Sequence, residues 1–195
     1  MGRLIWIAGL VLCVGLTDRQ TASGQPVIHI MVVDQAEVPP ATLQRAQDVA
    51  TRVFHLSGIA LVWVDAETCQ PPCLTVRIVT QPVSAQSRNQ HVLGVAPRPT
   101  EVRGSSLWIF YPRIRAHSAE LGMDASLLLG HVIAHEMGHL LLPHGAHSAA
   151  GLMRPIWDLA QVQAAGQGVL TFTPDQAGLI RERLHVDASP IADTP

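Results

Sequence analysis

Residues 131–153 read HVIAHEMGHLLLPHGAHSAAGLM and contain the motif around which the rest of the chain is organised. Within this stretch His135, Glu136 and His139 form the pattern HExxH. At about 100° per residue, a four-residue step in a helix leaves the two histidines about 40° apart on one face, so both imidazoles can bind one ion. Glu136 then stands beside that ion. The spacing predicts a helix that carries two metal ligands and a neighbouring carboxylate.

The chemistry expected of this motif is metal-assisted amide hydrolysis. Neutral imidazoles hold a zinc ion that makes its bound water more acidic, and the adjacent carboxylate takes the proton of that water as it attacks a carbonyl. The residues around the motif, Val132 to Ala134 and Leu140 to Leu142, are apolar, as in a buried helix whose polar side chains must be satisfied. A metal ion satisfies them, which favours a zinc site over a chance match.

The third ligand has to come from outside the helix. A catalytic zinc ion usually has three protein ligands and one open position. Pro143 and Gly145 end the helix, because proline cannot continue it and glycine readily adopts the left-handed cap conformation. The resulting turn brings the backbone back toward the metal and delivers His144 and His147 as alternative third ligands.

HExxH followed by a glycine-containing turn, a further histidine and Gly-x-Met resembles the metzincin clan of zinc metalloproteases; the match covers roughly residues 131–155. This chain has Leu142 at the clan's glycine position and Gly145 at its third-ligand position. It is more similar to a group of predicted secreted bacterial zinc proteases that read HExGHLLL, a short turn and HSxxGxM. That resemblance implies His147 as the third ligand and Met153 as the floor beneath the zinc.

Composition limits the class of protein. With 195 residues, 48% of them hydrophobic, the chain has room for one ordinary domain with a sizeable core. The formal net charge is -2 and there is no long charge run, which argues against a nucleic-acid surface and a polybasic membrane anchor. The partner that we expect is a protein or peptide substrate, with no nucleic acid and no stable membrane association, and we expect a monomer.

Residues 1–24 have the composition of a signal peptide. Arg3 supplies a positive charge, Leu4 to Leu16 an apolar run, and Ala22 to Gly24 a small-residue cleavage site. The apolar run is short for a membrane span, although an uncleaved anchor and, through Cys13, a lipoprotein are alternatives. The expected location is secreted or periplasmic in a bacterium.

Cys69 and Cys73 remain once that segment is removed. In an oxidising compartment, a close pair across a proline-rich turn is most simply a disulfide bond. A redox or second metal site is less favoured, because three residues separate the cysteines, rather than the two of CxxC, and no cysteine or histidine cluster surrounds them.

The remaining patterns predict an α+β fold. The expected strands are Val27–Val33, Ile59–Val64, Leu74–Thr80, His91–Ala96 and Leu107–Tyr111. The expected helices are a backing helix that ends at Ser57 and Gly58, the active-site helix capped by Asp124 or Ser126, and a C-terminal helix from Thr173 to about Leu184. We expect the second and third strands to form a hairpin stapled by the disulfide bond.

The order of these elements is similar to that of the upper subdomain of metzincins, a mixed twisted sheet in which a short edge strand binds substrate by strand addition. On that resemblance residues 25–187 form a metzincin-like metallopeptidase domain and residues 188–195 a flexible tail. His91–Ala96 then lines the cleft above the metal; the alternative is that it only closes the sheet. Trp157 forms either a pocket wall or part of the core.

The prediction is a secreted zinc-dependent endopeptidase. His135, His139 and His147 bind one zinc ion, and Glu136 acts as general base and then as proton donor to the leaving amine. Two alternatives stay open: a zinc-stabilised binding module without turnover, and a non-peptidase zinc amidohydrolase.

Overall fold

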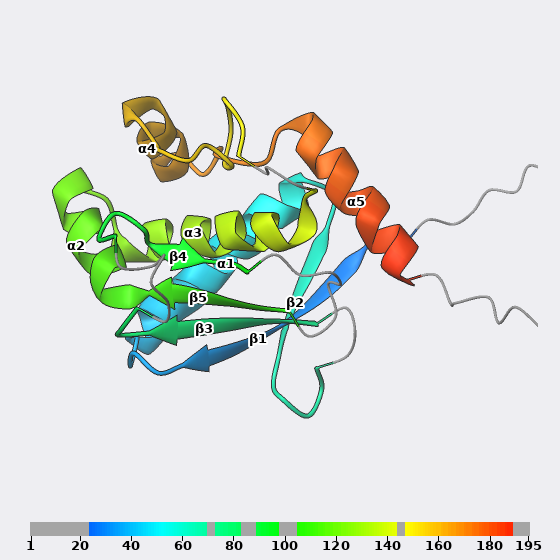
Figure 1. Ribbon diagram of the computed structural model, residues 1–195, viewed down its shortest axis with the longest axis horizontal. Helices are drawn as coiled ribbons and strands as arrows, with labels where there is room; N and C mark the ends of the chain where they lie inside the picture. Colours follow the sequence, from blue (N-terminus) through cyan, green and yellow to red (C-terminus); the bar gives the residue numbers. More distant parts are fainter. Residues whose placement is uncertain (1–23, 70–72, 83–88, 98–104, 144–146, 189–195) are drawn as a thin grey trace, which may run out of the picture.

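The computed structural model describes residues 24–69, 73–82, 89–97, 105–143 and 147–188 (Figure 1). Within these ranges the elements are β1 (Val27–Asp34), α1 (Pro40–Leu56), β2 (Ala60–Val64), β3 (Cys73–Val79), β4 (Gly94–Val95), β5 (Ser106–Phe110), α2 (Tyr111–Leu121), α3 (Ala125–Leu141), α4 (Leu159–Gly166) and α5 (Pro174–Ala188). The predicted α+β class is confirmed. The predicted signal peptide, except Gly24, and the predicted tail, except Ala188, lie outside the described residues.

The strands form one five-stranded mixed sheet in the order β2-β1-β3-β5-β4. Strands β2, β1, β3 and β5 run parallel, and β4 pairs with β5 in the antiparallel direction. The predicted hairpin of β2 and β3 is therefore wrong, because β1 lies between them and pairs with both. β1 is an apolar, β-branched run, the composition of a strand inside a parallel sheet. The predicted disulfide bond is present and joins Cys69 to Cys73 with the Cα atoms 5.9 Å apart.

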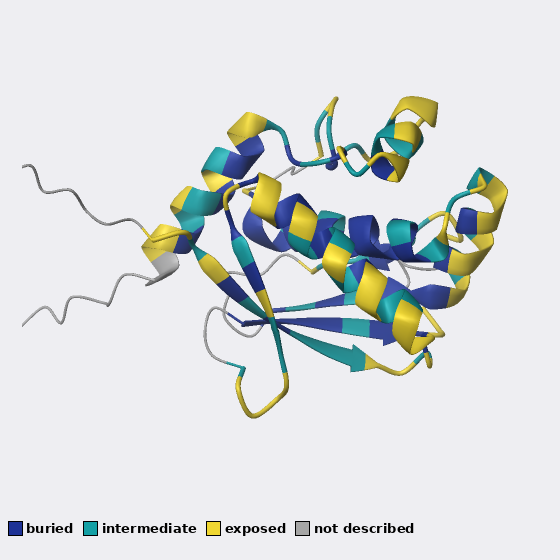
Figure 2. Ribbon diagram, turned by 180° about the vertical axis from the view of Figure 1, so that it is seen from behind, coloured by how far each residue is buried: buried dark blue, intermediate teal, exposed yellow. Residues whose placement is uncertain are grey.

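Helices α1 and α3 lie side by side against one face of the sheet (Figure 1). They approach closely at Gly130, where a Cβ atom would lie 2.5 Å from the carbonyl oxygen of Ala46. Figure 2 shows exposed residues along the outer side of α1, while α3 behind it is buried over most of its length. The helix that carries the HExxH motif is thus the central helix of the core.

Two helices in the structure have no counterpart among the predicted elements. α2 begins at Tyr111, directly after β5, at a residue that the sequence placed in the strand; it ends at Leu121 and is capped by Gly122, which has a φ of 62°. α4 begins with a capping box in which the side chains of Asp158 and Gln161 bond each other's backbone N–H groups. Among the described residues, no helix has the length and apolar character needed to cross a membrane.

The C-terminal helix starts as the sequence predicts. The Thr173 N–H donates to Oε1 of Gln176 at 3.0 Å, and the Gln176 N–H donates to Oγ1 of Thr173 at 3.3 Å. This pair forms the expected capping box, with Pro174 in the first turn. α5 is also tied to the end of α1, because Nη1 of Arg181 donates to the Ser57 carbonyl oxygen at 2.6 Å.

Candidate metal centre

The motif lies in the second half of α3, a helix of 17 residues. Asp124 is its N-cap, and the Asp124 carboxylate accepts from the Ser126 N–H at 2.8 Å. The helix ends at Leu141, and Leu142 is already extended, as expected before Pro143. The end of the helix therefore leaves His139 in the last turn, where the chain can return a further ligand to it.

Three histidines meet at this end of the helix. His135, His139 and His147 each have a ring nitrogen within 4.8 Å of those of the other two. Nε2 of His135 lies 3.1 Å from Nε2 of His139, and the His147 ring centroid lies 5.5 Å and 4.7 Å from the centroids of their rings. Three imidazoles facing one point can hold a metal ion. The alternative third ligand, His144, lies outside the described residues.

The His135 ring is held in the tautomer that a metal ligand needs. Its Nδ1 lies 2.9 Å from the Leu152 carbonyl oxygen, which can only accept, so Nδ1 carries the hydrogen and Nε2 keeps its lone pair. Burial lowers the pKa of His135 to about 4. The ring is therefore neutral near pH 7. No side-chain pattern could have predicted the role of Leu152, because it acts through its backbone.

Trp157 packs beside this ligand, so it belongs partly to the site and partly to the core. Its ring centroid is 6.4 Å from that of His135, in an edge-on arrangement, and its Nε1 donates to the same Leu152 oxygen at 3.2 Å. The Trp157 side chain is half-buried against the core cluster. The predicted core role is therefore supported, and the pocket-wall role stays a prediction.

The segment that delivers His147 is a compact loop fixed by backbone and side-chain bonds. The Ser148 N–H donates to the Met153 carbonyl at 2.9 Å, which closes the loop on itself. The Leu152 N–H donates to the Thr171 carbonyl at 2.8 Å, and Nε2 of Gln176 in α5 donates to Oγ of Ser148 at 3.0 Å. These bonds hold the residue after His147 against α5 and the residues that precede it.

Met153 is fully buried against α3. A Cβ atom added at Gly138 would lie 2.5 Å from Sδ of Met153 and 2.8 Å from Cε1 of Phe172. Only glycine leaves room there, at the position just before His139. Met153 therefore packs against α3 at the residue before His139, and its predicted role as a floor beneath a metal ion stays a prediction.

Glu136 is a buried carboxylate with 7% of its surface exposed. Burial raises its pKa to about 8. No hydrogen-bond or ion-pair partner of this carboxylate occurs among the residues that the structure describes. A buried carboxylate without a partner is costly, and a nearby cation would favour its ionised form. The orphaned carboxylate and the three imidazoles beside it thus fit a metal site.

The edge strand β4 passes directly over Glu136. A Cβ atom at Gly94 would lie 2.7 Å from Cγ and 3.0 Å from Oε1 of this side chain. Of the predicted strand His91–Ala96, only Gly94 and Val95 are extended in the sheet. Gly94 therefore lies beside Glu136, whereas the predicted role of this strand in lining a cleft stays a prediction. The need for glycine at this contact was not recognised from the sequence.

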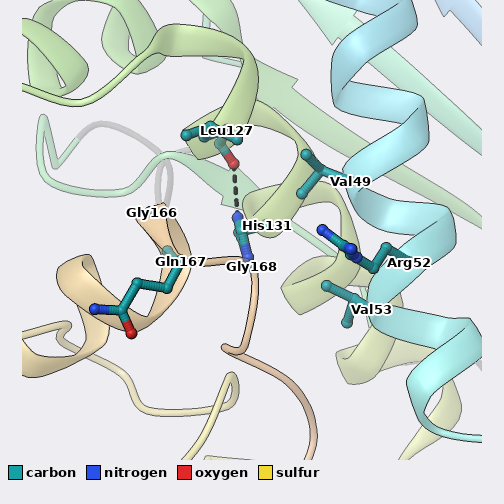
Figure 3. Close-up of a pocket in the computed structure, with 9 residues that line it drawn as sticks. Val49, Arg52, Val53, Leu127, His131, Gly166, Gln167 and Gly168 are labelled. Carbon is teal, nitrogen blue, oxygen red and sulfur yellow. Dashed lines mark hydrogen bonds between the residues drawn. The ribbon is translucent and has the colours of Figure 1, made fainter.

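His131 is the remaining histidine of α3, and it is not part of the metal group. Drift along the helix predicts that it leaves the ligand face, and its Nδ1 instead bonds the Leu127 carbonyl at 2.8 Å. The ring lines a pocket of about 120 Å³ on the side of α3 that faces α1 and the end of α4 (Figure 3). Arg52 and Gly168 lie on the other sides of this pocket. His131 is thus a packed, hydrogen-bonded helix residue, as predicted.

The sequence offers Tyr111 and His144 as candidates for a group that would stabilise a developing oxyanion, without deciding between them. Of the two residues that the sequence offered, His144 lies outside the described residues. Tyr111 is buried in the core, where desolvation raises its pKa and the charges of Arg115 and Asp34 shift the pKa in opposite directions. No protein-family model matches the chain, and no curated protein matches it.

Proposed function

We propose that this protein is a secreted, metzincin-like zinc endopeptidase in which His135, His139 and His147 hold one zinc ion and Glu136 is the general base. The observation that carries the proposal is the buried carboxylate of Glu136, which has no partner among the described residues, on the same helix as two of three imidazoles whose nitrogens lie within 4.8 Å of one another. Three nitrogen ligands with one open position are typical of catalytic zinc. The disulfide bond between Cys69 and Cys73 supports a location outside the cytoplasm.

The residues divide the chemistry between them. A bound zinc ion supplies Lewis-acid polarisation of a water molecule and of the scissile carbonyl. Glu136 takes a proton from the attacking water at its carboxylate and then donates it to the leaving amine. The bond from Nδ1 of His135 to the Leu152 carbonyl keeps that ring oriented with Nε2 toward the ion. Burial of Glu136 excludes bulk water from the proton transfer.

A peptide chain is favoured as substrate by the position of β4. This strand lies at the edge of the sheet, with β5 on one side and no strand on the other among the described residues. An edge strand offers unpaired N–H and C=O groups to an extended peptide. Because Gly94 touches Glu136, a peptide paired with β4 would run beside the general base. A small amide has no extended backbone that could pair with such an edge.

The arrangement of elements supports the metzincin comparison. An antiparallel edge strand beside four parallel strands, a central HExxH helix and Met153 packed against that helix agree with what the resemblance implies. The chain departs from the clan in the spacing to His147 and in Leu142 at the clan's glycine position.

Replacing Glu136 tests the proposal. The Glu136→Gln variant should bind zinc with unchanged stoichiometry and lose peptide cleavage by about 10²–10⁴-fold, because only the proton acceptor is removed. Glu67→Gln, at an exposed glutamate in a turn, is the matched control and should behave as the wild type. The assays are metal analysis and cleavage of a peptide library, with and without a chelator.

The same assays separate the alternatives. A binding module would cleave nothing in its wild-type, zinc-loaded form. A non-peptidase amidohydrolase would hydrolyse small amides and leave the peptide library intact. Either result overturns the peptidase proposal, as would full activity in Glu136→Gln.

A further inference from the structure

Strand β4 is too short to hold itself in place. It consists of Gly94 and Val95, which pair with Ile109 and Trp108 of β5. Two residues form few ladder bonds, and glycine loses more backbone entropy on ordering than any other residue. The position of the strand must therefore be fixed by the residues that lead into it.

Arg113, in the first turn of α2, fixes that lead-in segment. Its Nη1 donates to the Asn89 carbonyl at 2.9 Å and to the Val92 carbonyl at 2.7 Å. Its guanidinium carbon lies 4.7 Å from the ring centroid of Phe110, a side chain that is 1% exposed. The Phe110 N–H in turn donates to the Leu93 carbonyl at 2.9 Å. Bonds from a charged donor are about twice as strong as neutral ones, so Arg113 is a strong anchor for this segment.

The segment anchored by Arg113, residues 89–93, is followed directly by Gly94, which contacts Glu136. Gly94 follows Val92 by two residues and is in contact with Glu136, where a Cβ atom would meet Cγ at 2.7 Å. There is thus no free space between β4 and the carboxylate. A shift of the lead-in segment would move both the edge on which a peptide can pair and the wall of the pocket around Glu136.

We propose that Arg113 is a positioning residue that holds β4 above Glu136 and thereby sets how tightly a peptide substrate binds. This inference rests on the proposed peptidase function for its substrate and on the contacts above for its mechanism. Arg113 has no role in proton transfer. Its loss acts on substrate pairing rather than on the chemistry of the bound substrate.

Kinetics of the Arg113→Ala variant test this role. Removing a charge-assisted anchor should raise KM for a peptide about tenfold, with kcat and zinc content unchanged. Arg115→Ala, an exposed arginine two residues further along α2, is the matched control and should leave KM unchanged. Arg113→Lys should recover part of the loss, because its ammonium group can donate but lacks the planar fork. Added methylguanidinium should lower the KM of Arg113→Ala.

Hydrogen exchange provides a test that needs no turnover. The amide of Phe110 bonds Leu93 in the anchored segment, so its exchange should be faster in Arg113→Ala than in the wild type or in Arg115→Ala. The melting temperature of each variant shows whether the fold as a whole is retained.

The outcomes distinguish this inference from the function on which it rests. Equal KM and equal Phe110 exchange in the two alanine variants would overturn the inference while leaving the peptidase intact. A fall in kcat and zinc content at constant KM would also overturn it. If the wild type cleaves no peptide, the proposed function is wrong, and so is the role of Arg113 in substrate binding. Hydrogen exchange of the Phe110 amide would then be the test of whether Arg113 anchors β4.

Discussion

A histidine binds a metal ion only through an unprotonated ring nitrogen, and the surroundings of His135 enforce that state in two ways. Burial holds its pKa at about 4, and the Leu152 carbonyl takes the remaining N–H. The lone pair on Nε2 is therefore available at neutral pH, before any ion arrives. At the scale of the residue, burial and the Leu152 carbonyl oxygen together keep His135 in the form that can bind a metal ion.

The third ligand gives the first prediction. His147→Ala should weaken zinc binding by at least about 100-fold, since loss of a hydrogen-bonded neighbour of a ligand alone costs 10–100-fold. Competition with a chromogenic chelator measures the affinity. His55→Ala, at an exposed histidine on α1, is the control and should bind zinc as the wild type does. Unchanged affinity in His147→Ala, together with a loss in His144→Ala, would identify His144 as the ligand instead.

The site residues that were found from the sequence are those that contribute through their side chains. His135, Glu136 and His139 are recognisable by their spacing, and the turn after them indicates a further histidine. Leu152 and Gly94 were missed for the same reason. One acts through its carbonyl oxygen and the other through the lack of a side chain, and neither leaves a pattern of residue types.

At the scale of the element, α3 depends on its first turn. The Asp124 carboxylate caps the helix, and its hydrogen bonds from the side chain and backbone N–H of Ser126 hold its pKa below the ordinary value of 3.8. A carboxyl with a lowered pKa in the folded state stabilises the fold above its unfolded pKa. That contribution is lost as the pH falls through the folded value.

We therefore predict that Asp124→Ala lowers the free energy of unfolding by about 1 kcal/mol at neutral pH. The difference from the wild type should be full above about pH 5 and should shrink as the pH falls below 3.8. Asp124→Asn, which caps equally well, should retain most of the stability without this pH dependence. Urea unfolding at several pH values measures all three proteins; a pH-independent difference for the alanine variant would contradict the capping role.

The close crossing of α1 and α3 gives another prediction. Gly130→Ala places a methyl group 2.5 Å from the Ala46 carbonyl and 2.6 Å from Cβ of Val49, so the helices must separate. We expect a loss of about 1–3 kcal/mol, as for other overpacked cores. Gly166→Ala, where no atom lies within 4 Å of the new methyl group, should be neutral or slightly stabilising. Equal thermal stability of the two variants would show that the crossing tolerates side chains.

The sequence predicted the positions of most helices and strands, but not which strands pair with each other. Periodicity and caps identified α1, α3 and α5, because each has an apolar stripe or a recognisable end. The hairpin of β2 and β3 was wrong, because pairing partners are chosen by packing across the sheet, which short apolar runs do not encode. For α4 a signal was present in the Asp158 and Gln161 capping box; for α2, in Pro112 and Gly122 at its two ends.

At the scale of the whole molecule, the metal group joins the central helix to the segment that follows it. His135 and His139 belong to α3, whereas His147 belongs to the loop that Thr171 and Gln176 hold. An ion bound to all three would link these two parts of the fold. Since an unfolded chain does not bring the ligands together, binding stabilises only the folded state.

Zinc should therefore raise the melting temperature. At a free ion concentration 100 times the Kd, the stabilisation is about 2.7 kcal/mol, which corresponds to roughly 5–10 °C for a chain of this size. Differential scanning calorimetry with zinc and with a chelator measures the shift. His147→Ala should lose most of it. An equal shift in that variant would mean that the ion binds somewhere other than the three histidines.

The bond between Ser148 and Gln176 has a consequence for the newly made chain. His135 and His139 in α3 are synthesised before α5. Until α5 has been made, the loop next to His147 lacks the hydrogen bond from Gln176. If the three histidines bind zinc as proposed, the loop next to the third ligand gains this support only once α5 has been made and folded.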